Sequence, residues 1–318
     1  MNKLAILSVV AAVAAVVFVS YSPVQSPTLE SEFYTYMAEF GKSYTSEAEV
    51  EYRMQVFKQN MKQAKALNEL NPDAEFGATI FSDLTDEEML RRMGDLDMEV
   101  DTAIEHFFET AEPNGDINWI SKFSPIQNQG SCGSCWAFAA TANFEAWNNI
   151  IGKGLTKFSE QELVDCVTTC SGCNGGLANL AYDWLASNQF CTLESYPYLA
   201  KGGSCHSSTC KTEVTDKGHG MVSTGEAGIL KKLSEGPVSV SIDATVWKNY
   251  KGGILSEGCT MNTNHAVVVA AFNDQGADSY WTIRNSWGTG WGEQGYIRVH
   301  YGTNMCNIER RPSYPVFR

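Results

Sequence analysis

Hydrophobic positions divide the chain into a helix-rich first part and a strand-rich last part. Between residues 28 and 70, apolar side chains recur every three or four positions, a spacing that predicts two amphipathic helices. From residue 236 onwards, short runs rich in Val, Ile and aromatic residues predict strands. The expected elements are helices within 28–70 and at 134–151, 159–166 and 177–188, a short extended piece at 76–81, and strands at 237–242, 266–272, 280–284 and 296–299. The predicted fold class is therefore α+β.

The N-terminal segment indicates a secretory route. Lys3 precedes sixteen apolar-biased residues, Leu4 to Val19, and small residues follow them. A membrane-spanning helix needs about 20 apolar residues, so this run predicts a signal peptide over 1–22 and no stable membrane span. Ten cysteines, none before Cys132, are consistent with disulfide formation on that route.

Acidic charge is concentrated in the first third of the chain. The 110 residues before Ala111 hold 19 Asp and Glu against 8 Lys and Arg, and the remainder holds 18 against 15. This balance gives no case for nucleic-acid binding. Acidic residues gather between 95 and 109, a pattern typical of a solvated linker.

Three separate segments supply the residues of a thiol-based active site. Cys135 begins the helix predicted at 134–151, where free backbone N–H groups and the positive end of the helix favour thiolate over thiol. His265 opens one predicted strand and Asn285 follows another, 130 and 150 residues after Cys135. Cys, His and Asn in this order provide a nucleophile, its base and the group that orients the base.

These segments resemble the papain-like cysteine peptidases. The signature Cys132-Gly-Ser-Cys135-Trp136, with His and Asn roughly 130 to 150 residues later, is typical of that family. The resemblance extends from about Ala111 to the C-terminus. Its further matches are Asp165-Cys166, Ser171 to Gly176, Tyr196-Pro197-Tyr198, and Asn285 to Gly292.

The upstream part resembles the propeptides of cathepsin L-like enzymes. Two positions depart from the usual residues, Ala64 for a larger aliphatic residue and Thr79 for Asn. The resemblance implies an inhibitory propeptide over 23–110, called the prosegment below, that crosses the cleft in the non-productive direction, and a mature peptidase over 111–318. The matching residues are Glu49, Arg53, Val56, Phe57, Asn60, Ala64 and Asn68, and then Gly77 to Asp83. The implied fold is two-lobed, with the active-site cleft between a helical lobe and a β-barrel-like lobe.

The resemblance also implies a role for each site residue. Cys135 is expected to attack the peptide carbonyl, His265 to exchange the proton, and Asn285 to orient the imidazole. Gln129 is expected to donate its side-chain amide to the oxyanion, and Trp287 to shield the His265–Asn285 hydrogen bond. The implied substrate-binding residues are Gly175, Gly176, Leu177, Ala178, Ser241, Thr263, Asn264, Trp287, Trp291 and Arg311.

Among these residues, the orientation of Arg311 stays open. Pointing inward, it would shorten the pocket for the second residue before the cut or favour an acidic side chain there. Pointing outward, it would leave the pocket selective for apolar side chains. Gly175 and Gly176 leave the backbone bare, so that an extended substrate can pair with it, and Trp291 is expected on the leaving-group side.

The resemblance implies three disulfides and a free nucleophile at Cys135. The expected pairs are Cys132–Cys173, Cys166–Cys205 and Cys259–Cys306. An odd number of cysteines remains: Cys170, Cys191 and Cys210. The sequence leaves open which two of the three pair.

Three other readings compete. Cys132 and Cys135 also fit a Cys-x-x-Cys motif, although no strand of a thiol–disulfide oxidoreductase is predicted before it. Zinc at Cys166, Cys170 and Cys173 would lack a fourth ligand. A catalytically inactive relative is the last alternative, but all four chemical positions are filled.

The sequence therefore predicts a cysteine endopeptidase made as a zymogen. No cofactor or metal is implied. The expected partners are protein and peptide substrates, the prosegment and cystatin-like inhibitors, and the enzyme is expected to be a monomer in a lysosome, a digestive vacuole or the secreted fraction. A further hypothesis is that protonation of carboxylates from Asp95 onwards weakens prosegment docking in an acidic compartment.

Overall fold

The computed structural model describes residues 28–96, 115–207, 210, 216–222 and 225–317. The predicted signal peptide and the predicted junction near Ala111 lie outside the described residues. Within the described residues, no helix is both long and apolar enough to cross a membrane.

One lobe is built around a buried central helix. Its helices are α4 (Cys135–Ile150), α5 (Glu160–Cys166) and α6 (Ala178–Leu185). In α4 nearly every side chain is buried, and its many alanines let neighbouring backbones approach closely. The predicted helices at 134–151, 159–166 and 177–188 thus correspond to α4, α5 and α6 within a few residues.

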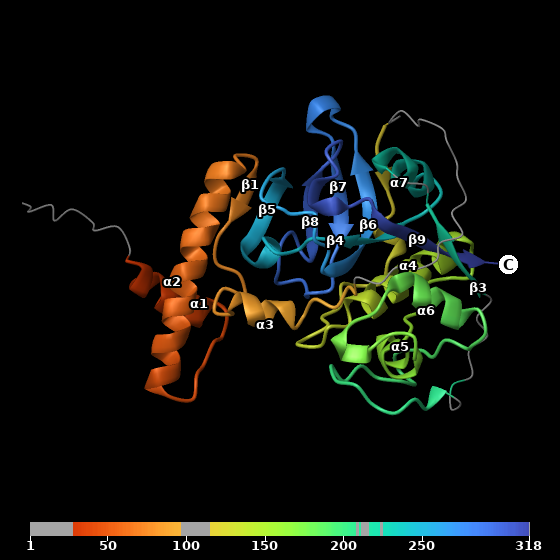
Figure 1. Ribbon diagram of the computed structural model, residues 1–318, viewed down its shortest axis with the longest axis horizontal. Coiled ribbons are helices and arrows are strands. Elements are labelled where there is room, and N and C mark those ends of the chain that lie inside the picture. Colours follow the sequence, from red (N-terminus) through yellow and green to blue (C-terminus); the bar gives the residue numbers. More distant parts are fainter. Residues whose placement is uncertain (1–27, 97–114, 208–209, 211–215, 223–224, 318) are drawn as a thin grey trace, which may run out of the picture.

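The other lobe is built around one continuous sheet, drawn mostly in cyan to blue in Figure 1, with the prosegment strand β1 in orange. The strand order is β1-β5-β8-β7-β6-β4-β9-β3, with β2 paired to β6. A short helix, α7 (Glu226–Leu233), precedes β4. The strands are β1 (Ala74–Phe76), β2 (Ile117–Asn118), β3 (Asp216–Met221), β4 (Val238–Ile242), β5 (Tyr250–Leu255), β6 (His265–Asn273), β7 (Tyr280–Arg284), β8 (Tyr296–His300) and β9 (Arg310–Phe317).

Strand β6 contributes to the cores of both lobes, because its side chains point alternately to either face. Ala266, Val268 and Ala270 belong to the hydrophobic core that contains α4, whereas Val267 and Val269 belong to the core of the β lobe. Side chains of a strand point alternately to opposite faces, so one apolar strand can serve two cores. Because β6 begins at His265, this packing places the histidine beside the start of α4.

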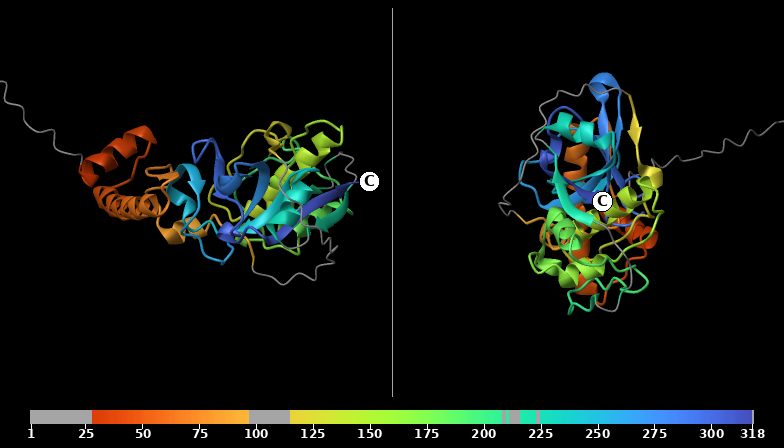
Figure 2. Two further views of the ribbon diagram at one scale, coloured as in Figure 1. Left: turned by 90° about the horizontal axis from the view of Figure 1, so that it is seen from above. Right: turned by 90° about the vertical axis from the view of Figure 1, so that its right-hand side faces the viewer.

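The prosegment forms a helical unit against the edge of the β lobe. It contains α1 (Leu29–Glu39), α2 (Glu47–Leu70), β1 and α3 (Asp86–Leu90), and Figures 1 and 2 show α1 and α2 beside β5 at one end of the molecule. Thr85 caps α3 in a capping box with Glu88. Strand β1 pairs antiparallel with β5, so the prosegment extends the sheet of the enzyme.

Candidate active site

Cys135 and His265 meet where the two lobes join. Cys135 is the first residue of α4 and His265 the first of β6, and both are fully buried. The backbone N–H of Ala266, next to the histidine, donates to Cys135 Sγ at 3.4 Å. The structure therefore brings together a thiol and an imidazole that lie 130 residues apart in the sequence.

Asn285 holds the imidazole of His265 through one ring nitrogen. Its Oδ1 lies 2.8 Å from His265 Nε2, while His265 Nδ1 has no hydrogen-bond partner among the described residues. The Trp287 ring lies 4.9 Å from the imidazole, centroid to centroid, and is itself buried. The asparagine can thus fix the ring plane while Nδ1 stays available for proton exchange.

Gln129 lies beside the nucleophile, oriented by a residue that sequence analysis missed. Its Nε2 donates to the carbonyl oxygens of Arg92, at 2.6 Å, and Cys132, at 2.9 Å. Its Oε1 accepts a hydrogen bond from Ser286 Oγ at 2.6 Å, which leaves the amide N–H groups directed at the site. The place of Ser286 between Asn285 and Trp287 was the available signal.

Residues 94–96 of the prosegment, the crossing strand below, lie across the thiol. The backbone N–H of Gly94 donates to Cys135 Sγ at 3.2 Å. Gly176 N–H donates to Gly94 O at 2.8 Å, and Leu96 N–H to Gly176 O at 3.4 Å, which makes a parallel bridge between Asp95 and Gly176. The bare backbone at Gly176 therefore pairs with an extended chain of the prosegment, and its pairing with a substrate stays a prediction.

Gly94 is the point of closest approach. A Cβ atom added there would lie 1.9 Å from the carbonyl oxygen of Gly133. No side chain can be accommodated at that distance without moving backbone. A glycine at this position therefore allows the crossing strand to reach the thiol.

Asp95 fills the pocket expected for the second residue before the cut. Ser241 Oγ donates to Asp95 Oδ1 at 2.8 Å, Arg311 Nη1 lies 3.4 Å from Asp95 Oδ2, and Thr263 adds a side-chain hydrogen bond. Of the two orientations left open for Arg311, the structure shows the inward one. The adjoining cavity is lined by Leu177, Ala178, Ser241, Ala266 and Arg311, among others.

Two further expected site residues have different surroundings. The Asn264 carbonyl accepts the N–H of Asp95 at 3.1 Å, so this residue contacts the crossing strand through its backbone. Trp291 is fully buried, with Nε1 donating to Trp247 O at 3.0 Å, and it packs edge-on to Trp287. Its expected place on the leaving-group side stays a prediction.

Burial favours the neutral forms of the thiol and the imidazole. It raises the pKa of Cys135 to about 12, even though N–H groups of Ala266, Gly94 and Trp136 act in the opposite direction. Burial likewise lowers the pKa of His265 to about 4, against the hydrogen bond that His265 donates to Asn285. Near neutral pH the covered site therefore holds a thiol and an uncharged imidazole, which is a poor nucleophilic pair.

Four disulfides cross-link the part of the chain that follows the prosegment. Three join Cys132 to Cys173, Cys166 to Cys205, and Cys259 to Cys306, the pairs implied by the resemblance. The fourth joins Cys191 to Cys210, which answers the open question and leaves Cys135 and Cys170 as free thiols.

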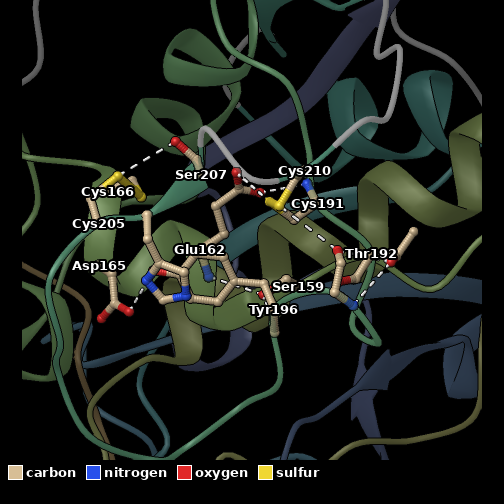
Figure 3. Close-up of a disulfide and its surroundings, with 12 residues drawn as sticks. Ser159, Glu162, Asp165, Cys166, Cys191, Thr192, Tyr196, Cys205, Ser207 and Cys210 are labelled. Atoms are coloured by element: carbon tan, nitrogen blue, oxygen red, sulfur yellow. Dashed lines mark hydrogen bonds between the residues drawn. A yellow bond between two sulfur atoms is a disulfide. The ribbon is translucent and has the colours of Figure 1, made fainter.

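The disulfides remove two of the alternative readings. Cys132 is bonded to Cys173, so it cannot form a redox pair with Cys135. Cys166 and Cys173 are likewise unavailable to zinc. Within the described ranges, the one cluster of metal-type side chains is Glu162 with Cys191 and Cys210, whose sulfurs are bonded to each other (Figure 3).

Comparisons with known proteins agree with this geometry. The profile of the papain family cysteine proteases matches residues 114–316, and that of the cathepsin propeptide inhibitor domain matches residues 33–89. The chain belongs to the papain family of cysteine proteases. The fold is papain-like, and the chain is a cysteine endopeptidase that carries its inhibitory prosegment.

Relatives of this papain-family chain include proteins of similar length. Cysteine proteinase 1 of Leishmania pifanoi is 35% identical over 308 residues, which cover 91% of this chain and 86% of the relative. Among solved structures, recombinant stem bromelain precursor has a TM-score of 0.83 and 29% identity, covering 91% of this chain and 99% of its own. Digestive procathepsin L 3 from the larval midgut of Tenebrio molitor has a TM-score of 0.79 and 29% identity, covering 92% and 100%.

Proposed function

We propose that Cys135, His265 and Asn285 hydrolyse peptide bonds through an acyl-enzyme. In the open site the Cys135 thiol passes its proton to His265 Nδ1, Sγ forms a bond to the carbonyl carbon, and the π electron pair moves to the carbonyl oxygen. As the oxyanion collapses and the C–N bond breaks, His265 gives that proton to the leaving amine, and water then attacks the thioester with His265 as base. The observation that carries the proposal is the contact of Cys135 Sγ with Ala266 N–H beside a His265 already bonded to Asn285.

The oxyanion site is proposed to be formed by the Gln129 amide and the backbone N–H groups at the start of α4. Gln129 Nε2 donates to a prosegment carbonyl, that of Arg92, at 2.6 Å. The Arg92 carbonyl therefore accepts the hydrogen bond that Gln129 would donate to the oxyanion of a tetrahedral intermediate. Loss of one oxyanion donor typically lowers turnover by about 10²–10³-fold.

The prosegment is proposed to inhibit because its direction is reversed. In a substrate, the side chain in this pocket comes just before the residue whose carbonyl is attacked. Here Asp95, in the pocket, comes after Gly94, at the thiol, and an N–H rather than a carbonyl meets Sγ. The sulfur therefore finds no carbon to attack.

Acid release of the prosegment is proposed to start at Glu88 rather than at Asp95; the other carboxylates of the acidic stretch lie outside the described residues. Burial raises the pKa of Asp95 to about 6, so its carboxyl takes up a proton on docking and acid strengthens its hold. The pKa of Glu88 is lowered, first by its bidentate hydrogen bonds from Arg53 at 2.7 and 2.9 Å. That stabilisation is present above the ordinary pKa of glutamate and is lost as the pH falls through the lowered one.

Maturation near Ala111, separating a prosegment of 23–110 from an enzyme of 111–318, is part of the proposal. So are a signal peptide over 1–22, a monomeric mature enzyme, inhibition by cystatin-like proteins, and an acidic lysosome or vacuole or the secreted fraction as destination. The acidic prosegment and the lowered pKa of Glu88 support activation at low pH, whereas the raised pKa of Asp95 acts in the opposite direction.

The test is incubation of the purified full chain at about pH 5 and about pH 7, with and without a thiol-reactive epoxide. We expect shortening to a fragment beginning near residue 111 at the lower pH, inhibitor-sensitive cleavage of an unfolded protein, and one epoxide on Cys135. A Cys135→Ser protein is the control and should neither shorten nor be labelled. A trimmed, folded protein without proteolysis or label would contradict the proposal.

A further inference from the structure

We propose that the pocket holding Asp95 selects an acidic side chain in substrates, with Arg311 as the residue that determines this specificity. The side chain concerned belongs to the second residue before the scissile bond, called the P2 side chain here. The inference rests on the proposed function and names its substrate class. The prosegment carries this preference as Asp95.

The pocket offers hydrogen-bond donors to both carboxylate oxygens. Ser241 Oγ donates to Oδ1 at 2.8 Å, the Arg311 guanidinium faces Oδ2 at 3.4 Å, and Thr263 adds a third side chain. The Asp95 side chain is 1% exposed and that of Arg311 10% exposed, so this ion pair is shielded from water. Charge-assisted hydrogen bonds of this kind are stronger than neutral ones.

Arg311 is directed into the pocket by an irregularity in β9. The pairing of β4 with β9 shifts register between Ser239 and Ser241, which pair with Ser313 and Arg310. Within that shift, Arg311 has φ of +51°, a left-handed conformation uncommon for arginine. Bulges of this type redirect a side chain and occur next to active sites.

An apolar P2 side chain would fit this donor set poorly. A leucine offers no acceptor to the guanidinium or to the hydroxyls of Ser241 and Thr263. Sites built to hydrogen-bond a substrate group reject analogues that lack it far more strongly than apolar pockets reject a smaller side chain. The pocket should therefore favour aspartate or glutamate over leucine.

The pH dependence supplies a second signature. The groups acting on the Asp95 carboxyl are Ser241 and Thr263, Arg310 and Arg311 of β9, and the Cys135 thiol of α4. Burial outweighs the two arginines, so the bound carboxyl has a pKa of about 6. A free aspartate has a lower pKa, so binding of an acidic P2 side chain takes up a proton between the two values and strengthens as the pH falls from 7 towards 5.

The experiment uses the trimmed enzyme, with active sites counted by epoxide labelling, and peptides that differ only in P2 Asp or Leu. We expect kcat/KM at about pH 5.5 to be at least about tenfold higher for the Asp peptide, because a leucine would leave the buried donors of the pocket without a hydrogen-bond partner. Arg311→Asn, chosen because asparagine tolerates the left-handed backbone, should reverse the preference, and Arg311→Lys should keep part of it. Arg310→Gln removes an exposed charge one residue away and should change the ratio far less.

The outcomes separate this inference from the proposed function. An enzyme that is labelled on Cys135 but prefers the Leu peptide, or whose ratio is the same in Arg311→Asn, overturns the acidic preference alone. A preference for the Asp peptide that weakens as the pH falls from 7 to 5, measured against the Leu peptide, also contradicts it. An unlabelled enzyme without proteolysis overturns both proposals.

Discussion

The prosegment is held in different ways in its helical part, residues 28–93, and in the crossing strand. The helical part depends on ion pairs such as Arg53–Glu88, whose acid has a lowered pKa. The crossing strand depends on backbone hydrogen bonds and on the buried Asp95, whose pKa is raised. Falling pH therefore loosens the internal fold of the first region, where Arg53 and Glu88 both belong to the prosegment, and tightens the binding of the second region in the cleft.

The largest effect is expected from Gly94→Val, which breaks the crossing strand alone. The added side chain meets the Gly133 carbonyl, and overpacking of this kind costs about 1–3 kcal/mol, or about 10–100-fold in docking. The measurement is the rate at which epoxide labels Cys135 in uncleaved chain at about pH 7. A rate equal to that of the unchanged chain would show that the strand does not guard the thiol.

Lys248→Met should weaken the docking of the helical part of the prosegment on the enzyme, with a smaller effect than Gly94→Val. Lys248 belongs to the enzyme, is buried, and donates to Asn60 Oδ1 at 2.7 Å and Asp86 Oδ1 at 2.6 Å in the prosegment. A buried acceptor left unpaired costs about 1–3 kcal/mol, so labelling at neutral pH should rise about tenfold. Because both partners leave with the prosegment, kcat/KM of the trimmed enzyme serves as the control and should change little.

Glu88→Gln should move the pH at which the precursor opens. The amide cannot form the charged pair with Arg53, so opening should begin at a pH higher by about one unit. The pH profile of Cys135 labelling checks this expectation. Glu87→Gln is the matched control, since its pair with Arg91 is largely exposed and should leave the profile in place.

Asp95→Asn should act in the opposite direction at neutral pH. The amide removes the cost of burying a charge, so labelling of Cys135 at about pH 7 should slow by up to about tenfold, with less change at about pH 5. Glu75→Gln removes a prosegment carboxylate paired with Lys251 at an exposed position and serves for comparison. Faster labelling of Asp95→Asn at neutral pH would mean that the ion pair with Arg311 outweighs burial.

Sequence patterns predict the catalytic residues better than they predict what fills the pocket of Asp95. Cys135, His265 and Asn285 could be predicted because each opens or follows an apolar element within a recognisable motif. Asp95 was interpreted as a linker acid, because nothing local connects it to Arg311, which lies 216 residues away. The occupant of the pocket is a long-range contact, and long-range contacts leave little trace in one sequence.

The missed elements have local reasons. Strand β9 contains Pro312 and Pro315, which argue against a strand, but the Pro312 carbonyl still accepts a hydrogen bond from Val222 N–H at 2.9 Å. Strands β3 and β5 each carry two glycines, which weaken the β signal. The pairing of Cys191 with Cys210 could not be chosen by spacing, because all three remaining cysteines lie within one loop-rich region.

The backbone N–H of Gly94 at the sulfur has a consequence for the time course of activation. A precursor with no carbonyl against its own thiol cannot cut the segment that covers it. The first cleavage must then come from a different molecule that is already open, and each cleavage releases one more active enzyme molecule. Conversion should show a lag that shortens as the protein concentration rises, and a trace of trimmed enzyme should abolish that lag.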